Sequence, residues 1–203
     1  MKKIIAFFLI LSCSMALLAA PAKPTAPKTK AQKAVPSILF DGKKFYLQYS
    51  SGNSQQWLNE YLPKGQNFNN YTEMLTARSY DAVTATPEQI GRSIIVNLLK
   101  TYPKTPYNFV KGIHPDEVEI SFAIPGQWVD EFNLFRIIPG KNGHPIALQY
   151  VRRAVYSPSD TQEQIEQKNS QLTISMRKDF DRWLKALRTL PVPKMQRTPK
   201  NSI

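Results

Sequence analysis

The sequence predicts an α+β domain in which an antiparallel sheet is covered by two main helices, an α/β/α-type sandwich. Runs of alternating apolar and polar residues, the pattern of pleated strands, occur both before and after residues 87–101. Two stretches, 87–101 and the one that follows residue 160, carry apolar residues at helical spacing. The resulting order of strands, helix, strands, helix is typical of blocks of antiparallel strands covered by helices.

Residues 1–19 have the zones of a secretory signal: the charged pair Lys2 and Lys3, a mostly apolar run and a small residue at Ala19. We expect cleavage near Ala19 and export, with the periplasm as the destination and secretion as an alternative. Cys13 is the single cysteine of the chain, and the residues before it loosely resemble a lipoprotein signal. A lipid-anchored envelope protein, with membrane contact through Cys13, is therefore a further alternative.

Residues 20–36 are rich in Pro, Lys and Ala and have too few large apolar side chains to bury a core. We expect an extended linker there. Residues 37–190 then form one domain of ordinary size. Residues 191–203 are predicted to be a loose basic tail.

Basic residues outnumber acidic ones, with 27 Lys and Arg against 15 Asp and Glu and a formal net charge of +12. This balance favours an unknown envelope protein or an anionic surface as the partner. A simpler interpretation is that the excess of basic residues only keeps the protein soluble. Nucleic acid is not expected as a partner, because an exported protein meets little of it and the chain has no nucleotide-binding motif.

The central stretch, residues 57–81, is predicted to be two strands joined by a polar loop. Residues 57–62 and 73–78 alternate, Pro63 ends the first strand, and Gly65 allows the chain to turn. The loop is either a plain turn or a recognition surface anchored by one exposed aromatic ring. The candidate partner-binding residues are Lys64, Phe68, Asn69, Asn70 and Tyr71.

Two further hairpins are predicted. Residues 38–50 contain two aromatic-rich runs separated by Asp41 and Gly42, a favoured two-residue turn. Residues 132–138 and 146–155 alternate on either side of a turn-rich segment.

The first helix is predicted over residues 87–101, because Thr86 and Gln89 have capping-box spacing around Pro87. The second helix is expected after a cap at residues 157–160. Its apolar residues recur at intervals of seven, four and three, which keeps one stripe facing the sheet. The stripe comprises Ile165, Leu172, Met176, Phe180, Trp183 and Leu187.

A strand over residues 118–124 buries its even-numbered residues and is expected to show Glu117 and Glu119 to water. With His114, the carboxylates of residues 116–119 could serve as acid and base, which makes a small secreted hydrolase an alternative. A solvated strand face explains the same residues more simply. The chain has only two histidines, each beside a proline, so no metal or other cofactor is expected.

The paired strands around YLPKGQNFNNYTEML, the helix at 87–101, the hairpin around residues 139–145 and the long closing helix resemble the PsbP-like fold of DcrB-type exported proteins. The resemblance lies in the order of elements over most of residues 37–190. YLPKGQ followed by NNYTEML is also similar to a pattern in uncharacterised exported proteins of Gram-negative bacteria. The resemblance implies an accessory or binding module, and it transfers no site residue.

We therefore expect a non-catalytic exported accessory or binding module of unknown ligand, with no catalytic residue. The chain has no G-x-S-x-G motif, no phosphate-binding glycine loop and too few histidines for the usual nucleophile schemes.

Overall fold

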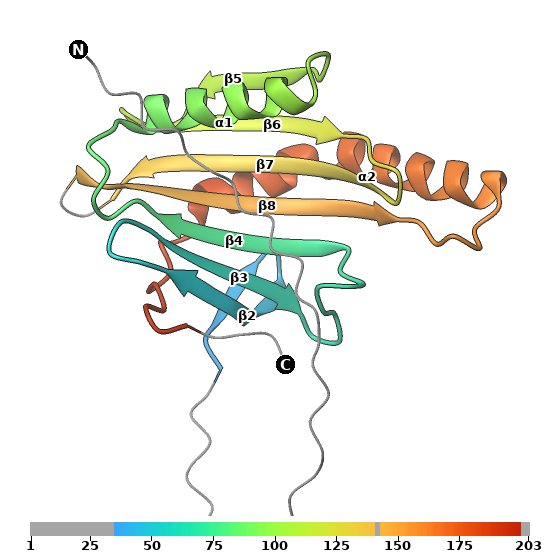
Figure 1. The fold of residues 1–203 in the computed structure, drawn as a ribbon, viewed down its shortest axis with the longest axis horizontal. Coiled ribbons are helices and arrows are strands. Elements are labelled where there is room, and N and C mark those ends of the chain that lie inside the picture. The colour runs from blue at the N-terminus through green and yellow to red at the C-terminus, as the bar shows by residue number, and fades with distance from the viewer. Residues whose placement is uncertain (1–34, 141–142, 200–203) are drawn as a thin grey trace, which may run out of the picture. The chain divides into compact units, whose positions relative to one another are not determined.

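The computed structural model describes residues 35–140 and 143–199. The predicted signal, Cys13 and the linker up to residue 34 lie outside the described residues. The unit that begins at Val35 contains one eight-stranded antiparallel sheet with two helices packed against it (Figure 1). This architecture confirms the predicted fold class. No helix of the described part of the chain is long and apolar enough to cross a membrane.

The strands are β1 (Ser37–Phe40), β2 (Lys43–Gly52), β3 (Trp57–Pro63), β4 (Glu73–Ser79), β5 (Tyr107–Lys111), β6 (Val118–Ile124), β7 (Val129–Pro139) and β8 (Pro145–Val155). The helices are α1 (Pro87–Thr101) and α2 (Gln162–Thr189).

The order of strands in the sheet is β1-β2-β3-β4-β8-β7-β6-β5. The first four strands form a meander, and the chain then passes through α1 to the far edge and returns strand by strand to β8 (Figure 1). The last strand therefore lies beside β4, where Thr76 pairs with Gln149. Residues about seventy positions apart thus meet at the centre of the sheet.

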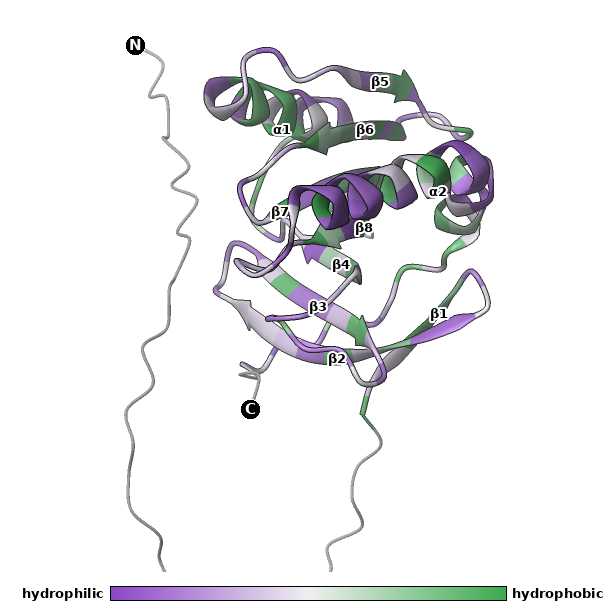
Figure 2. Cartoon of the chain, turned by 90° about the vertical axis from the view of Figure 1, so that its right-hand side faces the viewer, coloured by the Kyte–Doolittle hydropathy of each residue, from purple (hydrophilic) through white to green (hydrophobic). Residues whose placement is uncertain are grey.

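The two helices cover opposite faces of the sheet. On β7, Phe132 and Leu134 belong to the core cluster that includes the apolar residues of α2, whereas Phe135 and Ile137 belong to the cluster that includes those of α1. Successive side chains of a strand point to opposite faces, so this division places one helix on each side. Figure 2 shows that α2 carries both hydrophobic and strongly hydrophilic residues, as a helix with one buried stripe must.

The predicted stripe of α2 is confirmed. Leu172, Trp183 and Leu187 are buried, and the other three predicted residues pack against the same cluster. The ring of Trp183 lies 5.2 Å from that of Tyr150 and 6.1 Å from that of Phe132, centroid to centroid. These aromatic contacts connect the helix to β7 and β8.

Two elements that were predicted from short sequence motifs are confirmed. Thr86 and Gln89 form the predicted capping box at the start of α1. Asp41 and Gly42 both have positive φ, 49° and 74°, which is the backbone of the two-residue hairpin turn predicted between β1 and β2.

Two predictions about elements were wrong. The cap of α2 is Thr161, which forms a capping box with Gln164, whereas residues 157–160 form a turn before it. Both segments carry capping residues, and the reciprocal Gln at capping-box spacing decides between them. Strand β5 was not predicted, because its five residues have little alternation of their own and gain their conformation by pairing with β6.

The expectation of a loose tail is wrong for residues 191–199. The backbone carbonyl of Gln196 accepts hydrogen bonds from Ser50 and Asn59, both at 2.9 Å, and its N–H donates to Asn59 Oδ1 at 2.6 Å. Arg197 pairs with Asp81, and this hydrogen-bonded ion pair lowers the pKa of the Asp81 carboxyl. Buried polar groups on β2 and β3 therefore hold the segment after α2 on the sheet.

The expectation that Glu117 and Glu119 face water is also wrong, since both are buried. Arg136 Nη2 donates to Glu117 at 2.8 Å, and the Arg188 guanidinium donates to both oxygens of Glu119 at 2.7 and 2.8 Å. The polar face of β6 lies towards α2, so its carboxylates are buried as ion pairs.

The open face of β2, β3, β4 and β8 as a candidate functional site

One half of one sheet face carries no helix in the described part of the chain. Helix α1 packs on β6, β7 and β8, and Figure 1 shows the face of β2, β3 and β4 on that same side without a covering helix. We call this surface, together with the adjoining part of β8, the open face. It is defined by Tyr49, Leu58, Glu60, Thr76, Arg78, Gln149 and Arg153.

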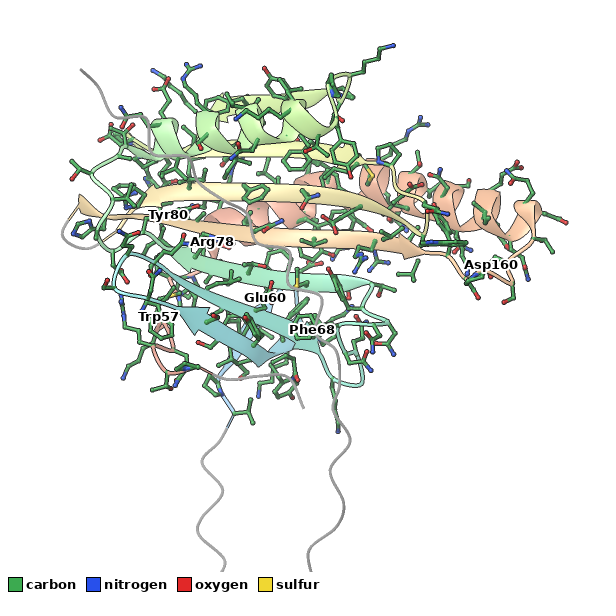
Figure 3. The ribbon with its side chains drawn as sticks, in the orientation of Figure 1. Trp57, Glu60, Phe68, Arg78, Tyr80 and Asp160 are labelled. Atoms are coloured by element: carbon green, nitrogen blue, oxygen red, sulfur yellow. The ribbon has the colours of Figure 1, made fainter. Side chains whose placement is uncertain are left out.

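The period of the strands brings these residues together. Glu60 pairs with Thr76 across β3 and β4, and Thr76 pairs with Gln149 across β4 and β8, so the three form one row across the sheet. Leu58 and Arg78 form the neighbouring pair. Figure 3 shows the side chains of Glu60 and Arg78 on this face, on the adjacent strands β3 and β4.

Glu60 is a half-buried carboxyl on the open face. Burial raises its pKa above the ordinary value, and the positive charge of Arg78 offsets part of that rise. Since burial disfavours the charged form, an ionised Glu60 lowers the stability of the fold. Carboxyls whose pKa is raised by burial occur more often at functional sites than elsewhere, which makes Glu60 a candidate.

Two buried polar atoms of the open face have no hydrogen-bond partner in the structure, Thr76 Oγ1 and Arg153 Nε. Thr76 is only 7% exposed. The nearest carboxylate oxygen to Arg153 Nε belongs to Glu131 and lies 3.6 Å away, beyond the range of a hydrogen bond. An unpaired buried polar group costs about 1–3 kcal/mol, so these two groups lower the stability of the fold.

Beside these atoms, polar side chains form a connected chain. Gln149 Nε2 donates to Asn133 Oδ1 at 2.6 Å, and Asn133 Nδ2 donates to Glu131 at 2.9 Å. The guanidinium of Arg153 lies over the ring of Tyr71, 4.2 Å from its centroid. These contacts hold the polar groups of the open face in place.

The predicted binding residues of the loop divide into two groups. Lys64, Asn69 and Asn70 are exposed, whereas Tyr71 is buried and Phe68 half-buried. Burial raises the pKa of the Tyr71 hydroxyl to about 12, so it stays neutral.

Phe68 is half-buried, whereas the recognition alternative for the loop assumed an exposed ring. Its ring packs edge-on against Tyr49 at 6.3 Å and against Tyr71 at 6.4 Å, centroid to centroid. Packing against these two aromatic rings removes the apolar surface of the Phe68 ring from water, which favours the half-buried position. Phe68 therefore closes one end of the open face.

The polar residues of the loop shape the loop itself. Gln66 Oε1 accepts from the backbone N–H of Thr72 at 2.8 Å, and Asn70 Oδ1 accepts from the N–H of Asn67 at 2.8 Å. Gly65 has φ 84°, a turn conformation that favours glycine. Some of the asparagines that suggested a recognition surface therefore form hydrogen bonds within the loop.

The residues considered for hydrolysis are not brought together as a site. His114 and Asp116 lie in the exposed turn before β6, while the Glu117 carboxylate pairs with the buried Arg136 and the Glu119 carboxylate with the part-exposed Arg188. His114 lines neither of the two cavities described for this chain. In residues 35–140 and 143–199, no cluster of three or more His, Cys, Asp or Glu side chains suits a metal ion.

Sequence reasoning missed Thr76, Gln149 and Arg153 as a group. Alternation places Glu60 on one side of β3, and Thr76 and Arg78 on one side of β4. The pairing of β4 with β8 depends on strand order, for which the sequence has no local signal.

Residues 33–192 of the chain match the model of a protein family whose function is uncharacterised. No curated protein matches the sequence.

Proposed function

Because the chain belongs to this family of uncharacterised function, we propose its role from geometry: a non-catalytic accessory or binding module that docks a protein partner on the open face. The proposal includes export to the cell envelope through the signal pattern of residues 1–19. A relation to PsbP-like accessory proteins, in the order of strands and helices, is part of the same proposal.

The observation that carries the proposal is the half-face without a covering helix, which leaves Leu58, Glu60 and Arg78 part-exposed on the neighbouring strands β3 and β4. A protein surface placed over the open face would offer acceptors to the part-exposed guanidinium groups of Arg78 and Arg153 and would bury Leu58.

The charge of the open face indicates the kind of surface that fits it. Arg78 and Arg153 add positive charge beside Glu60, and the whole chain has a formal net charge of +12. An acidic surface on a partner protein of the envelope is therefore favoured, because opposite charges speed encounter and fix orientation.

Capture of a partner by variants of the open face tests this function. Arg78→Ala should weaken capture from an envelope extract about tenfold, the effect of losing roughly 1.4 kcal/mol of binding free energy. The only described hydrogen bond of its side chain is a long one of 3.5 Å to Gln56. Because its charge also offsets the burial of Glu60, the thermal midpoint of the variant checks that the fold is retained.

The matched control is Arg177→Ala, which removes the same charge from an exposed position on α2. It should leave capture unchanged. Equal capture by the parent and both variants, or an equal loss in both variants, would remove the open face as the docking surface.

A further inference from the structure

A second feature lies on the opposite face of the sheet, where α2 and the hairpin of β1 and β2 enclose a cavity of about 270 Å³. Its floor includes the buried rings of Tyr150 and Trp183. Three cations, Lys43, Arg152 and Arg182, and three carboxylates, Asp41, Glu73 and Asp179, line it.

The six charges form two groups, each with one shared residue. Glu73 pairs with Lys43 and with Arg152, the latter at 2.8 Å, and it accepts a hydrogen bond from the Tyr150 hydroxyl at 3.0 Å. Burial, together with the charge of Glu73, raises the pKa of Tyr150, so this hydroxyl stays protonated and donates. Each oxygen of Glu73 is thus occupied by a donor.

Arg182 is the shared residue of the second group. It pairs with Asp41 across the mouth of the cavity and with Asp179, one turn earlier on α2, at 3.0 Å. The arginine joins the tip of the β1–β2 hairpin to the helix and places its guanidinium at the entrance.

The cations and carboxylates differ in how far they reach into solvent. The side chains of Lys43, Arg152 and Arg182 are 50%, 30% and 53% exposed. Those of Glu73, Asp41 and Asp179 are 9%, 20% and 22% exposed. The carboxylates therefore lie behind the cations and hold them, and the cavity presents positive groups to a ligand.

We propose that this cavity binds the phosphoryl group of a phosphate monoester, either a soluble one or the headgroup of a phospholipid that ends in a phosphate monoester. Lysine carries three N–H donors and arginine five, and the ion pairs described above use only part of them. A phosphoryl group offers three strong acceptor oxygens and close to two negative charges, one oxygen for each of the three cations. Planar guanidinium groups suit such oxygens with paired hydrogen bonds.

Stability alone does not account for the arrangement. Ion pairs with half-exposed partners add little to stability, and burial of the Glu73 carboxylate costs free energy unless its donors are held in place. Binding of an anion would explain why three cations with free N–H donors line the cavity.

The test is titration of the full chain with one probe for a soluble phosphate monoester and one for a lipid headgroup. Isothermal titration with glycerol 3-phosphate represents a free monoester, and co-sedimentation with phosphatidic acid vesicles represents a headgroup that is itself a phosphate monoester. Lys43→Gln and Arg182→Gln should each weaken binding of the probe about tenfold. Both residues are half-exposed, so the variants should fold, and their thermal midpoints check this.

The control is Lys185→Gln, an exposed position of α2 that does not line the cavity and gives the same change of charge. Binding of the monoester supports a soluble ligand, and binding of vesicles alone supports the headgroup, provided that only the cavity variants lose it. Binding of neither probe, or an equal loss in all three variants, would overturn the proposal. Because the open face lies on the other side of the sheet, these results are independent of partner docking.

Discussion

Glu60 shows how a single half-buried carboxyl can lower the stability of the fold. Its carboxyl is half-buried on a face with no helix, and burial raises its pKa. The native state therefore binds the proton more tightly than the unfolded chain does. Stability falls as pH rises from the ordinary value of 4.5 through the raised native pKa, and above it the cost of the charge is present in full.

Glu60→Gln should raise the free energy of unfolding at pH 7, because the amide avoids the cost of burying a charge. Urea denaturation of parent and variant at pH 7 and at pH 4.5 measures this, and the advantage of the variant should shrink at the lower pH. A variant less stable than the parent at pH 7 would show that the attraction between Glu60 and Arg78 outweighs burial.

Phe68 provides a second test at the scale of one side chain. Phe68→Ala should lower the free energy of unfolding by about 1.5–2.5 kcal/mol, half the cost of a fully buried phenylalanine, since the ring is half-buried. The exposed neighbours Asn69→Ala and Lys64→Glu serve as controls and should lie within about 0.5 kcal/mol of the parent. Equal melting temperatures for the Phe68, Asn69 and Lys64 variants would show that the Phe68 ring does not stabilise the fold.

At the scale of elements, Arg136 connects β6, β7 and the end of α2. Its guanidinium pairs with Glu117 and donates to the carbonyl oxygens of Leu187 and Leu190, both at 3.3 Å. A cation at the C-terminal end of a helix satisfies its last carbonyl groups and complements its dipole. One buried side chain thus fixes where α2 ends on the sheet.

Arg136→Met should cost about 3–5 kcal/mol, because it leaves the buried carboxylate of Glu117 without its partner. The double variant Arg136→Met with Glu117→Gln should recover part of this loss in the same denaturation experiment. A double variant as unstable as the sum of the two single variants would mean that the pair is not coupled.

The elements also show what the sequence could predict. The start of α1 was predictable because Thr86 and Gln89 act within one turn, and the β1–β2 hairpin because Asp41 and Gly42 specify it locally. The surroundings of Glu119 were not predictable, because alternation shows that a strand has a polar face and not which element packs on it. The open face depends on which strand pairs with β4, a contact between distant parts of the chain.

At the scale of the whole molecule, the sheet, both helices and both main core clusters consist of residues that follow Ala34. Removal of residues 1–34 should therefore leave cooperative unfolding and the thermal midpoint unchanged. Removal of residues 1–40 is the control. It deletes β1 with the buried side chains of Ile38 and Phe40 and should lower the midpoint. A loss of cooperativity in the shorter deletion would contradict this domain boundary.

Site-specific photo-crosslinking of the partner tests the docking surface most directly. A photoreactive phenylalanine derivative replaces Leu58 on the open face or, as the control, Ile174, which is 60% exposed on α2. Docking on the open face predicts a crosslinked partner from position 58 and none from position 174. A crosslink from position 174 with none from position 58 would contradict it.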